Sequence, residues 1–460
     1  MIRMFNHWFS WRSVAGALFD FSFLIVSLLI ILMWVNSGLP VNIPQVLIFA
    51  ALFATVMLAI NILLGFYQKK TNFSFADKRA RAMLSLYLAI PVAYGLYALL
   101  PITSVNRDLM QLSAMSAVFG MLVTRVSAAY SPTTKILRRR IMVFGTGQQA
   151  LSVKHALEHS DPSAEIIGFY PGSNEDSPQV AANMILTRDL PLSDCARNLR
   201  ADEIVVALSE RRGGAMPLRE LLDCKLQGIR VLDLASHFEQ TLGQIRLDSL
   251  YAGWLIFGDG FRQGFVRTLV KRIFDIVCAS ILITLALPVM SIAAVLIVVE
   301  DGFPLLYRQE RVGLSGRLFN VIKFRSMRRD AEKDGKPIWA QAKDSRVTRV
   351  GQFIRKLRID ELPQLFSVLK GDMSLVGPRP ERPFFVDQLT KEIPFYAVRH
   401  SVKPGVTGWA QVRYHYGSTV EDSAEKLQYD LYYVKNHSLF LDIVVLFETI
   451  GVVLTGKGAQ

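Results

Sequence analysis

The sequence predicts a membrane protein in three parts: an α-helical bundle of four spans, a degenerate Rossmann-like α/β domain, and a mixed, mainly α domain with a re-entrant helix. Three observations support this prediction. Four long apolar stretches occupy the first third of the chain, short apolar segments alternate with helix-like stretches in the next part, and a proline interrupts a fifth long apolar stretch. Because 51% of the residues are hydrophobic, much of the chain is expected to lie in lipid. We place the domains at 1–135, 136–260 and 261–460.

The predicted bundle consists of residues 14–35, 44–66, 82–100 and 109–129. Each stretch approaches the roughly 20 residues that cross a hydrocarbon core. The first loop, 36–43, carries no charge. The second loop holds five basic residues, Lys69, Lys70, Lys78, Arg79 and Arg81. By the positive-inside rule, both ends of the bundle are cytoplasmic. No small-residue cleavage pattern follows the first stretch, so we interpret it as a retained anchor.

The formal net charge is +13. The basic residues cluster beside apolar segments, which favours topology control and binding of anionic headgroups or phosphates over binding of nucleic acid. The three cysteines, Cys195, Cys224 and Cys278, form no CxxC pair. Neither a zinc site nor a disulfide framework is therefore predicted.

The α/β domain is predicted from three short apolar segments, 141–144, 166–170 and 204–208, which are typical of buried strands. The first segment leads into Gly145-Thr146-Gly147, the start of a dinucleotide-binding fingerprint, but no third glycine follows at the required spacing. A GxG alone is a weak signal. Two interpretations stay open: a cofactor site, or a non-binding structural or regulatory domain in which the glycines serve only the turn.

The fifth apolar stretch lies within residues 271–300, and Pro288 interrupts it near its middle. Both flanks are basic, with Arg262, Arg267, Lys271 and Arg272 before it and Arg308, Arg311, Arg317, Lys323 and Arg325 after it. A spanning helix would translocate the second basic group, against the charge rule. We therefore predict a re-entrant helix that turns at Leu287-Pro288 and returns to the cytoplasmic side. A kinked fifth span is the alternative.

The remaining residues predict a hairpin from 305–309 and 319–324. They also predict helices at 347–358, 362–369, 423–436 and 439–454. The charged segment 328–346 is interpreted as a surface loop, with a lid over the active site as the alternative.

The chemistry is predicted at Asp360 and Glu361, two adjacent carboxylates among several cations. Phosphoryl transfer requires alignment and charge neutralisation around the phosphates. A carboxylate can bind Mg²⁺, or it can act as a nucleophile and form an acyl phosphate. The cations available are Lys323, Arg325, Arg355, Arg358 and Arg379. On composition alone, a solvated charged helix face is the alternative.

Five motifs occur in order in the last part of the chain. They are Lys271-Arg272-Ile273-Phe274-Asp275, Lys323-Phe324-Arg325-Ser326-Met327, Asp360-Glu361-Leu362-Pro363-Gln364, a segment from Gly371 to Pro380, and Pro404-Gly405-Val406-Thr407-Gly408-Trp409. With them, the chain from about residue 271 onward resembles the bacterial sugar transferase family, the monotopic phosphoglycosyl transferases. The whole length resembles the larger members, the undecaprenyl-phosphate hexose-phosphate transferases of exopolysaccharide biosynthesis. Leu287 and Ser367 depart from the serine and asparagine that are common in the family.

The resemblance implies that Asp360 attacks the sugar-bearing phosphorus of a UDP-sugar, expels UMP and carries a sugar-phosphoryl aspartate, with Mg²⁺ bound nearby through Asp360. Glu361 would position groups around it. Polyprenyl phosphate would then accept the hexose phosphate, the first membrane step of exopolysaccharide or glycoconjugate synthesis. The expected phosphate-contacting or substrate-binding residues are Lys323, Arg325, Arg355, Arg379, Lys403 and Gln411, the last two as candidates for a uridine or sugar pocket.

The resemblance also implies a multi-pass protein of the bacterial inner membrane, with its catalytic domain on the cytoplasmic face, and homodimers are expected among the larger relatives. The sequence leaves open whether glucose, galactose or an N-acetylated hexose is transferred. An alternative function is a membrane-tethered NAD-dependent nucleotide-sugar epimerase or dehydratase, although no Tyr-x-x-x-Lys pair occurs. A third interpretation is a scaffold for polysaccharide export, which would not explain the acidic pair.

Overall fold

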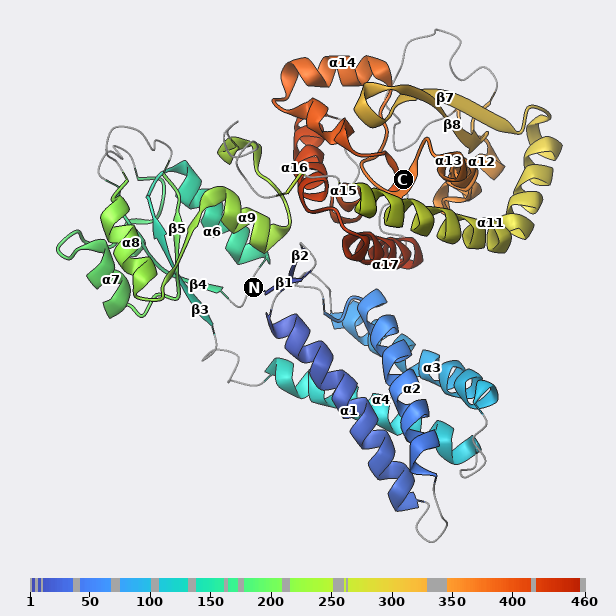
Figure 1. The fold of residues 1–460 in the computed structure, drawn as a ribbon, viewed down its shortest axis with the longest axis horizontal. Helices are drawn as coiled ribbons and strands as arrows, with labels where there is room; N and C mark the ends of the chain where they lie inside the picture. The colour runs from blue at the N-terminus through green and yellow to red at the C-terminus, as the bar shows by residue number, and fades with distance from the viewer. Residues whose placement is uncertain are drawn as a thin grey trace. The chain divides into compact units, whose positions relative to one another are not determined.

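The computed structural model describes residues 2–4, 7–9, 11–35, 42–67, 75–100, 107–130, 138–160, 164–172, 178–208, 216–250, 260–261, 264–328, 346–414 and 419–455. The chain divides into two compact units, which Figure 1 draws together. The first comprises Met1–Ile2 and Phe9–Leu242, and the second comprises Arg3–Trp8 and Gly243–Gln460. Lys69, Lys70 and nearly all of the predicted loop 328–346 lie outside the described residues.

All four N-terminal apolar stretches form helices, as predicted. They are α1 (Trp11–Val35), α2 (Ile43–Leu63), α3 (Phe75–Leu99) and α4 (Arg107–Tyr130). Leu28 and Phe53 are fully buried among them. The buried Asn61 carboxamide accepts a 2.7 Å hydrogen bond from the Ser85 hydroxyl. Polar contacts of this kind join helices in an apolar environment, where neither group has water as an alternative partner.

Four helices of the described chain are long and apolar enough to cross a membrane. They are Ser13–Trp34, Ile43–Leu63, Arg81–Leu99 and Phe265–Asp301. These helices indicate membrane association. Three of them belong to the predicted bundle. The helix α4 is not among the four, so its crossing stays a prediction.

A four-stranded parallel sheet forms the predicted α/β domain. Its strands are β3 (Arg139–Phe144), β4 (Ala164–Tyr170), β5 (Glu203–Val206) and β6 (Arg230–Asp233), in the order β4-β3-β5-β6. Its helices are α6 (Gln148–Ser160), the short η1 (Ala182–Met184), α7 (Leu192–Asn198), α8 (Leu218–Leu226) and α9 (Leu234–Leu242). Successive strand residues face opposite sides, so Val143 packs with α6 and α9 and Phe144 with α7 and α8. These two pairs of helices cover opposite faces of the sheet (Figure 1). The three predicted strands are confirmed.

The glycine-containing turn joins β3 to α6. Gly145 adopts φ +126°, a conformation that favours glycine. The carbonyl oxygen of Thr146 accepts a 2.8 Å hydrogen bond from the backbone N–H of Gln179. The contact holds the segment after β4 against this turn. The Rossmann-like character of the domain stays a prediction, and both interpretations of the turn, a cofactor site or a non-binding domain, stay open.

The second unit contains a hairpin, a second pair of strands and several short helices. The strands are β7 (Leu306–Val312), β8 (Leu318–Phe324), β9 (Ser374–Val376) and β10 (Gly405–Thr407); β7 and β8 pair antiparallel, and β9 and β10 pair parallel. The helices are η2 (Leu247–Ser249), α11 (Phe265–Asp301), η3 (Leu314–Gly316), α12 (Arg349–Lys356), η4 (Ile359–Glu361), α13 (Gln364–Lys370), α14 (Pro383–Glu392), η5 (Tyr396–Ser401), α15 (Trp409–Arg413), α16 (Val420–Asn436) and α17 (Leu439–Thr455). The predicted hairpin and terminal helices are confirmed.

The core of this unit centres on aromatic side chains. Trp409 and Tyr432 are buried and stack with ring centroids 5.8 Å apart. His7 packs edge-on against Trp409 and forms a 2.7 Å hydrogen bond with the Tyr432 hydroxyl. His7 belongs to β2 (His7–Phe9), which pairs with β1 (Ile2–Met4). Residues from the start of the chain therefore complete a core built from its end.

The helix α11 is 37 residues long, contains Pro288 and bends near its middle (Figure 1), as prolines cause. Both of its ends contact the same unit. Near the first end, Arg272 donates 2.6 and 2.7 Å hydrogen bonds to the last carbonyls of α13. At the other end, the Glu300 carboxylate accepts a 2.8 Å hydrogen bond from the N–H of Arg349 at the start of α12. A straight helix of this length would extend about 55 Å.

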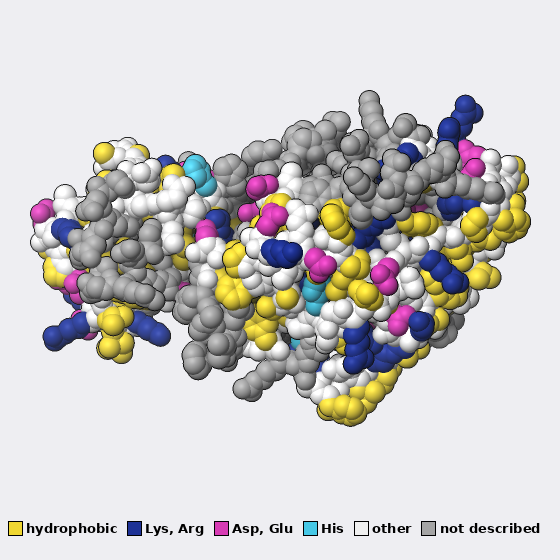
Figure 2. Space-filling model, turned by 90° about the horizontal axis from the view of Figure 1, so that it is seen from above, with side chains coloured by type: hydrophobic (Ala, Val, Ile, Leu, Met, Phe, Trp, Pro, Cys, Tyr) yellow, Lys and Arg dark blue, Asp and Glu magenta, His cyan; other side chains and the backbone are white. Residues whose placement is uncertain are grey.

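The bend of α11 is covered with exposed hydrophobic side chains. Leu285, Leu287, Val289 and Ile292 each expose 43% or more of their surface. Figure 2 shows hydrophobic side chains gathered at the end of the unit where α11 bends. An exposed apolar patch of this kind is typical of a membrane contact.

Candidate active site

The acidic pair lies on a short turn between two helices. Arg358 adopts a left-handed conformation, φ +58°, which ends α12 and redirects the chain into η4. Asp360 and Glu361 are each only 9% exposed. Pro363 then stands at the N-cap of α13, where a fixed φ suits the start of a helix. A continuous helix therefore does not cross the pair, which lies between α12 and α13.

Glu361 is bound by cations from three parts of the unit. Its Oε1 accepts hydrogen bonds from Lys323 Nζ on β8 (2.8 Å) and from the Arg379 guanidinium (3.0 Å). Arg358 lies 3.7 Å from its Oε2. Burial alone would raise the pKa of Glu361, but these cations hold that pKa well below its usual value. Glu361 is therefore a permanent anion that fixes the positions of Lys323 and Arg379.

Asp360 has a different environment. Within the described part of the chain, no hydrogen bond or ion pair engages its carboxylate. Burial and the neighbouring Glu361 raise the pKa of Asp360 to about 6, against the opposing effect of Lys323, Arg355 and Arg379. A buried, unengaged carboxylate of raised pKa is a typical reactive group. Among the described residues, the two adjacent acids thus have different environments: Glu361 is bound by cations, and the Asp360 carboxylate is buried without such a contact.

Arg379 owes its position to close backbone packing. It follows β9, and Gly377 N–H donates a 2.9 Å hydrogen bond to the Thr407 carbonyl at the end of β10. A Cβ on Gly377 would lie 2.3 Å from the Lys403 carbonyl oxygen, so glycine is required there. The loop from Pro378 to Pro380 therefore leaves the β9–β10 pair in a fixed direction.

The structure places two further predicted residues away from the acidic pair. Arg325 is buried at the C-terminus of α11, where it donates 2.9 and 2.6 Å hydrogen bonds to the carbonyls of Asp301 and Gly302. Lys403 lies at the C-terminal end of α13, where a Cβ on Gly371 would be 3.7 Å from its Nζ. That is the opposite end of α13 from the pair.

The last two predicted residues differ in their placement. Arg355, on the final turn of α12, is close enough to lower the pKa of Asp360. Gln411, on α15, donates a 3.4 Å hydrogen bond to the Val406 carbonyl. The Gln411 Oε1 is buried without a hydrogen-bond partner in the described chain. Thus Lys323, Arg355 and Arg379 gather around the acidic pair, while a substrate contact of Arg325, Lys403 or Gln411 stays a prediction.

Sequence reasoning missed the residues that bind the main-chain carbonyls of the loop from Pro378 to Pro380. Arg399 is 6% exposed and donates hydrogen bonds to the Arg379 carbonyl (2.8 Å) and the Tyr396 hydroxyl (2.6 Å). It also forms a 2.8 Å ion pair with the buried Asp430. Arg311 supports the next carbonyl, that of Pro380, at 3.2 Å. No local pattern marks these residues, because the Arg379 and Pro380 carbonyls and the Asp430 carboxylate that they bind are distant in the sequence.

A divalent cation fits the site through Asp360 alone. The described residues contain no group of three or more His, Cys, Asp or Glu side chains placed to hold a metal. Mg²⁺ does not need such a group, since it is often bound by one or two carboxylates, water and substrate phosphates. Glu361 is occupied by Lys323 and Arg379, whereas no described residue forms a hydrogen bond or ion pair with the Asp360 oxygens. The donor set fits a metal that arrives with a phosphorylated substrate.

Comparison with known proteins gives a consistent result. A family model described as bacterial sugar transferase matches residues 266–456. A UDP-N-acetylgalactosamine-undecaprenyl-phosphate N-acetylgalactosaminephosphotransferase from Aeromonas hydrophila is 45% identical over 262 residues, which are 57% of this chain and 61% of the relative. The match therefore spans less than two thirds of that relative.

Two other relatives are covered more fully. A putative undecaprenyl-phosphate N-acetylgalactosaminyl 1-phosphate transferase from Bacillus subtilis is 54% identical over 130 residues, 28% of this chain and 72% of the relative. A UDP-glucose:undecaprenyl-phosphate glucose-1-phosphate transferase from Caulobacter vibrioides is 43% identical over 192 residues, 41% of this chain and 71% of the relative. The region matched by the family model, residues 266–456, contains the acidic pair and its cations.

Proposed function

This chain belongs to the bacterial sugar transferase family, and from that premise we propose that it transfers a hexose-1-phosphate from a UDP-sugar to polyprenyl phosphate and releases UMP. The observation that carries the proposal is the difference between the environments of Asp360 and Glu361. Glu361 is bound by Lys323 and Arg379, whereas the Asp360 carboxylate is buried, has a raised pKa and forms no hydrogen bond or ion pair with the residues that the structure describes.

In the first step, an Asp360 carboxylate oxygen attacks the sugar-bearing phosphorus of the UDP-sugar. The bond from this phosphorus to the bridging oxygen breaks, and UMP leaves with the electron pair. The product on the enzyme is a sugar-phosphoryl aspartate, an acyl phosphate. The positive charges of Lys323 and Arg379 support this step, since they stand beside the carboxylate and can neutralise the diphosphate.

In the second step, a phosphate oxygen of polyprenyl phosphate attacks the same phosphorus. The acyl phosphate bond breaks, Asp360 is regenerated as a carboxylate, and the product is a polyprenyl-diphospho-sugar. Glu361 keeps Lys323 and Arg379 in place during both steps. Mg²⁺ held by Asp360 would neutralise phosphate charge when bound.

The proposal includes a re-entrant α11 in the cytoplasmic leaflet of the inner membrane. Two observations support it. Both ends of α11 contact the same folded unit, and the bend at Pro288 carries exposed apolar residues. A spanning helix would instead separate its ends by the hydrocarbon core, about 30 Å thick. With this placement, the acidic pair would lie near headgroup depth, where a soluble nucleotide sugar and a lipid phosphate can meet.

The sugar is to be identified by a panel of UDP-sugars, including UDP-N-acetylgalactosamine and UDP-glucose, because relatives are named for both. Pocket shape decides such preferences. The epimerase or dehydratase alternative is not favoured, since the relatives are named as sugar-phosphate transferases. A homodimer remains part of the proposal and can be measured by light scattering of the purified protein.

The test is release of UMP by the purified full chain with Mg²⁺, a UDP-sugar and undecaprenyl phosphate. Asp360→Asn is expected to lower turnover by on the order of 10³-fold or more. The matched control is Asp387→Asn, an exposed acid on α14, which is expected to retain turnover. Without the acceptor lipid, mass spectrometry should find a hexose phosphate on the peptide that contains Asp360. Release of UDP instead of UMP, or full activity of Asp360→Asn, would overturn the proposal.

A further inference from the structure

Three charged side chains in the first turns of α11 have no part in the two chemical steps. They are Lys271, Arg272 and Asp275. Their hydrogen bonds go to β9, to the end of α13 and to α17. Lys271 and Asp275 are four positions apart, so they lie on one face of the helix. The start of α11 therefore contacts both the strand that precedes Arg379 and the helix that follows the acidic pair.

The strand β9 is held by side chains at two consecutive residues. The Asp275 carboxylate is 3% exposed and accepts a 3.2 Å hydrogen bond from the backbone N–H of Leu375. The carbonyl oxygen of Val376 accepts hydrogen bonds from Lys271 Nζ (3.2 Å) and from the Tyr433 hydroxyl (2.9 Å). Side chains of α11 and α16 thus fix the end of β9.

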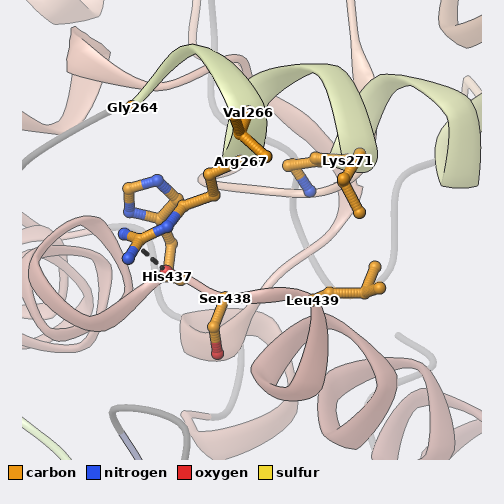
Figure 3. Close-up of a pocket in the computed structure, with 8 residues that line it drawn as sticks. Gly264, Val266, Arg267, Lys271, His437, Ser438 and Leu439 are labelled. Atoms are coloured by element: carbon orange, nitrogen blue, oxygen red, sulfur yellow. Dashed lines mark hydrogen bonds between the residues drawn. The ribbon is translucent and has the colours of Figure 1, made fainter.

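A buried carboxylate holds two of these side chains. Asp442, on α17, is 1% exposed; its Oδ2 lies 2.7 Å from Lys271 Nζ, and its Oδ1 accepts a 2.6 Å hydrogen bond from the Tyr433 hydroxyl. Lys271 also lines a cavity of about 520 Å³ between α11 and residues 437–439, which join α16 to α17 (Figure 3). A charge-assisted network of this kind gives its members a fixed geometry.

The two segments that α11 contacts each lead to one half of the active site. β9 ends at Val376, three residues before Arg379, and α13 begins at Gln364, three residues after Glu361. Arg272 binds the last carbonyls of α13 at 2.6 and 2.7 Å. Because Arg379 lies 3.0 Å from Glu361, a shift of β9 relative to α13 would separate the two charges.

We propose that Lys271, Asp275 and Tyr433 are positioning residues, which keep Arg379 at the acidic pair through β9. The start of α11 is then the common support of both halves of the site. The inference rests on the proposed function and extends it to residues that do not touch the substrate. A displacement of about 1 Å in a catalytic group can cost much of the rate.

The first experiment removes one oxygen atom from the network of the full chain. Tyr433→Phe leaves Lys271 as a partner of both Asp442 and the Val376 carbonyl, so the variant should fold. Its kcat for UMP release is expected to fall roughly threefold to tenfold. The matched control is Tyr429→Phe on the same helix, since the Tyr429 hydroxyl forms no hydrogen bond with the described residues. This control should retain the wild-type kcat.

A second pair of variants tests the contact of Asp275 with β9. Asp275→Leu removes the acceptor of the Leu375 N–H and should lower kcat roughly tenfold. Asp275→Asn keeps an acceptor oxygen and should restore most of the rate. If Asp275→Leu fails to fold in thermal unfolding, Tyr433→Phe decides the matter.

The pH profile separates positioning from stability. Arg379, together with Lys323 and Arg355, lowers the pKa of Asp360. If Arg379 is displaced in Tyr433→Phe, the acid limb of kcat/KM should therefore move to higher pH. Leu427→Ala, which truncates a buried side chain on α16, should lower the melting temperature and leave the limb in place.

Hydrogen exchange tests the network without any substrate. The segment 374–380 should exchange faster in Tyr433→Phe than in Tyr429→Phe. Equal exchange in these two variants, or an acid limb that does not move in Tyr433→Phe, would overturn the inference. A wild type that releases no UMP would overturn the proposed function instead, and the exchange measurement would still decide whether the network holds the segment.

Discussion

The guanidinium of Arg399 donates a 2.8 Å hydrogen bond to the main-chain carbonyl oxygen of Arg379, the residue whose side chain binds Glu361. Arg399 is itself fixed by the buried Asp430 at 2.8 Å. A buried ion pair therefore holds the backbone of the Pro378–Pro380 loop, and through it the cation at the acidic pair. We expect Arg399 to be a positioning residue, which does not touch the substrate.

This relationship predicts the behaviour of two variants. Arg399→Met should destabilise the protein by about 3–5 kcal/mol, because it leaves Asp430 buried and uncompensated. The double variant Arg399→Met with Asp430→Leu should recover most of that stability but not the turnover, since the Arg379 carbonyl still lacks its donor. Thermal unfolding and UMP release measure the two effects. Recovery of both together would show that Arg399 acts on stability alone.

Removal of the Glu361 charge should disable the site without unfolding it. Glu361→Gln leaves Lys323 and Arg379 without the anion that fixes them, and burial already lowers the pKa of Lys323. We expect turnover to fall on the order of 10²-fold. Glu392→Gln, an exposed acid on α14, is the control. A variant that turns over as fast as this control would contradict the assigned role.

The pH profile should report Asp360. A nucleophilic carboxylate must be ionised, and burial with the neighbouring Glu361 raises the pKa of Asp360 to about 6. The value of kcat/KM should therefore be highest above pH 6 and fall about tenfold per pH unit below it. Arg355 lowers this pKa, so Arg355→Gln should move the acid limb to higher pH. A limb that stays in place, or moves lower, would argue against Asp360 as the titrating group.

Arg325 is expected to stabilise the fold rather than bind the nucleotide. It is bound to the carbonyls of Asp301 and Gly302 at the end of α11, with Asp301 Oδ2 at 3.1 Å. Arg325→Gln should lower the melting temperature and leave the KM for the UDP-sugar unchanged. A large rise in KM with an unchanged melting temperature would instead indicate that Arg325 contacts the substrate.

The topology of α11 can be tested by labelling with a membrane-impermeant maleimide. A cysteine at Arg308, which is exposed on β7 after the helix, should react in inverted vesicles and not in intact cells. A cysteine at Asn42, before α2, should react in intact cells, because the uncharged loop before it is expected outside. Labelling at position 308 from outside would show that α11 spans the membrane.

The motif Asp360-Glu361-Leu362-Pro363-Gln364, the apolar stretches and the hairpin were predictable because each is encoded by neighbouring residues. Hydrophobic periodicity and segment length reflect local burial. The same local reasoning identified Asp360 and Glu361 as the candidate reactive pair. It also treated Lys323 and Arg325 alike, since both are basic and only two positions apart.

Only the tertiary structure separated Lys323 from Arg325 and brought Lys323, Arg358 and Arg379 onto Glu361. It alone showed that Arg399 and Asp430 are paired in the interior, and that His7 contacts Trp409. The sequence by itself determined which residues were available for phosphate chemistry. The different environments of Asp360 and Glu361 depend on burial and on contacts between distant segments, because the distance to other charges and to water decides which carboxyl has its pKa raised and which has it lowered.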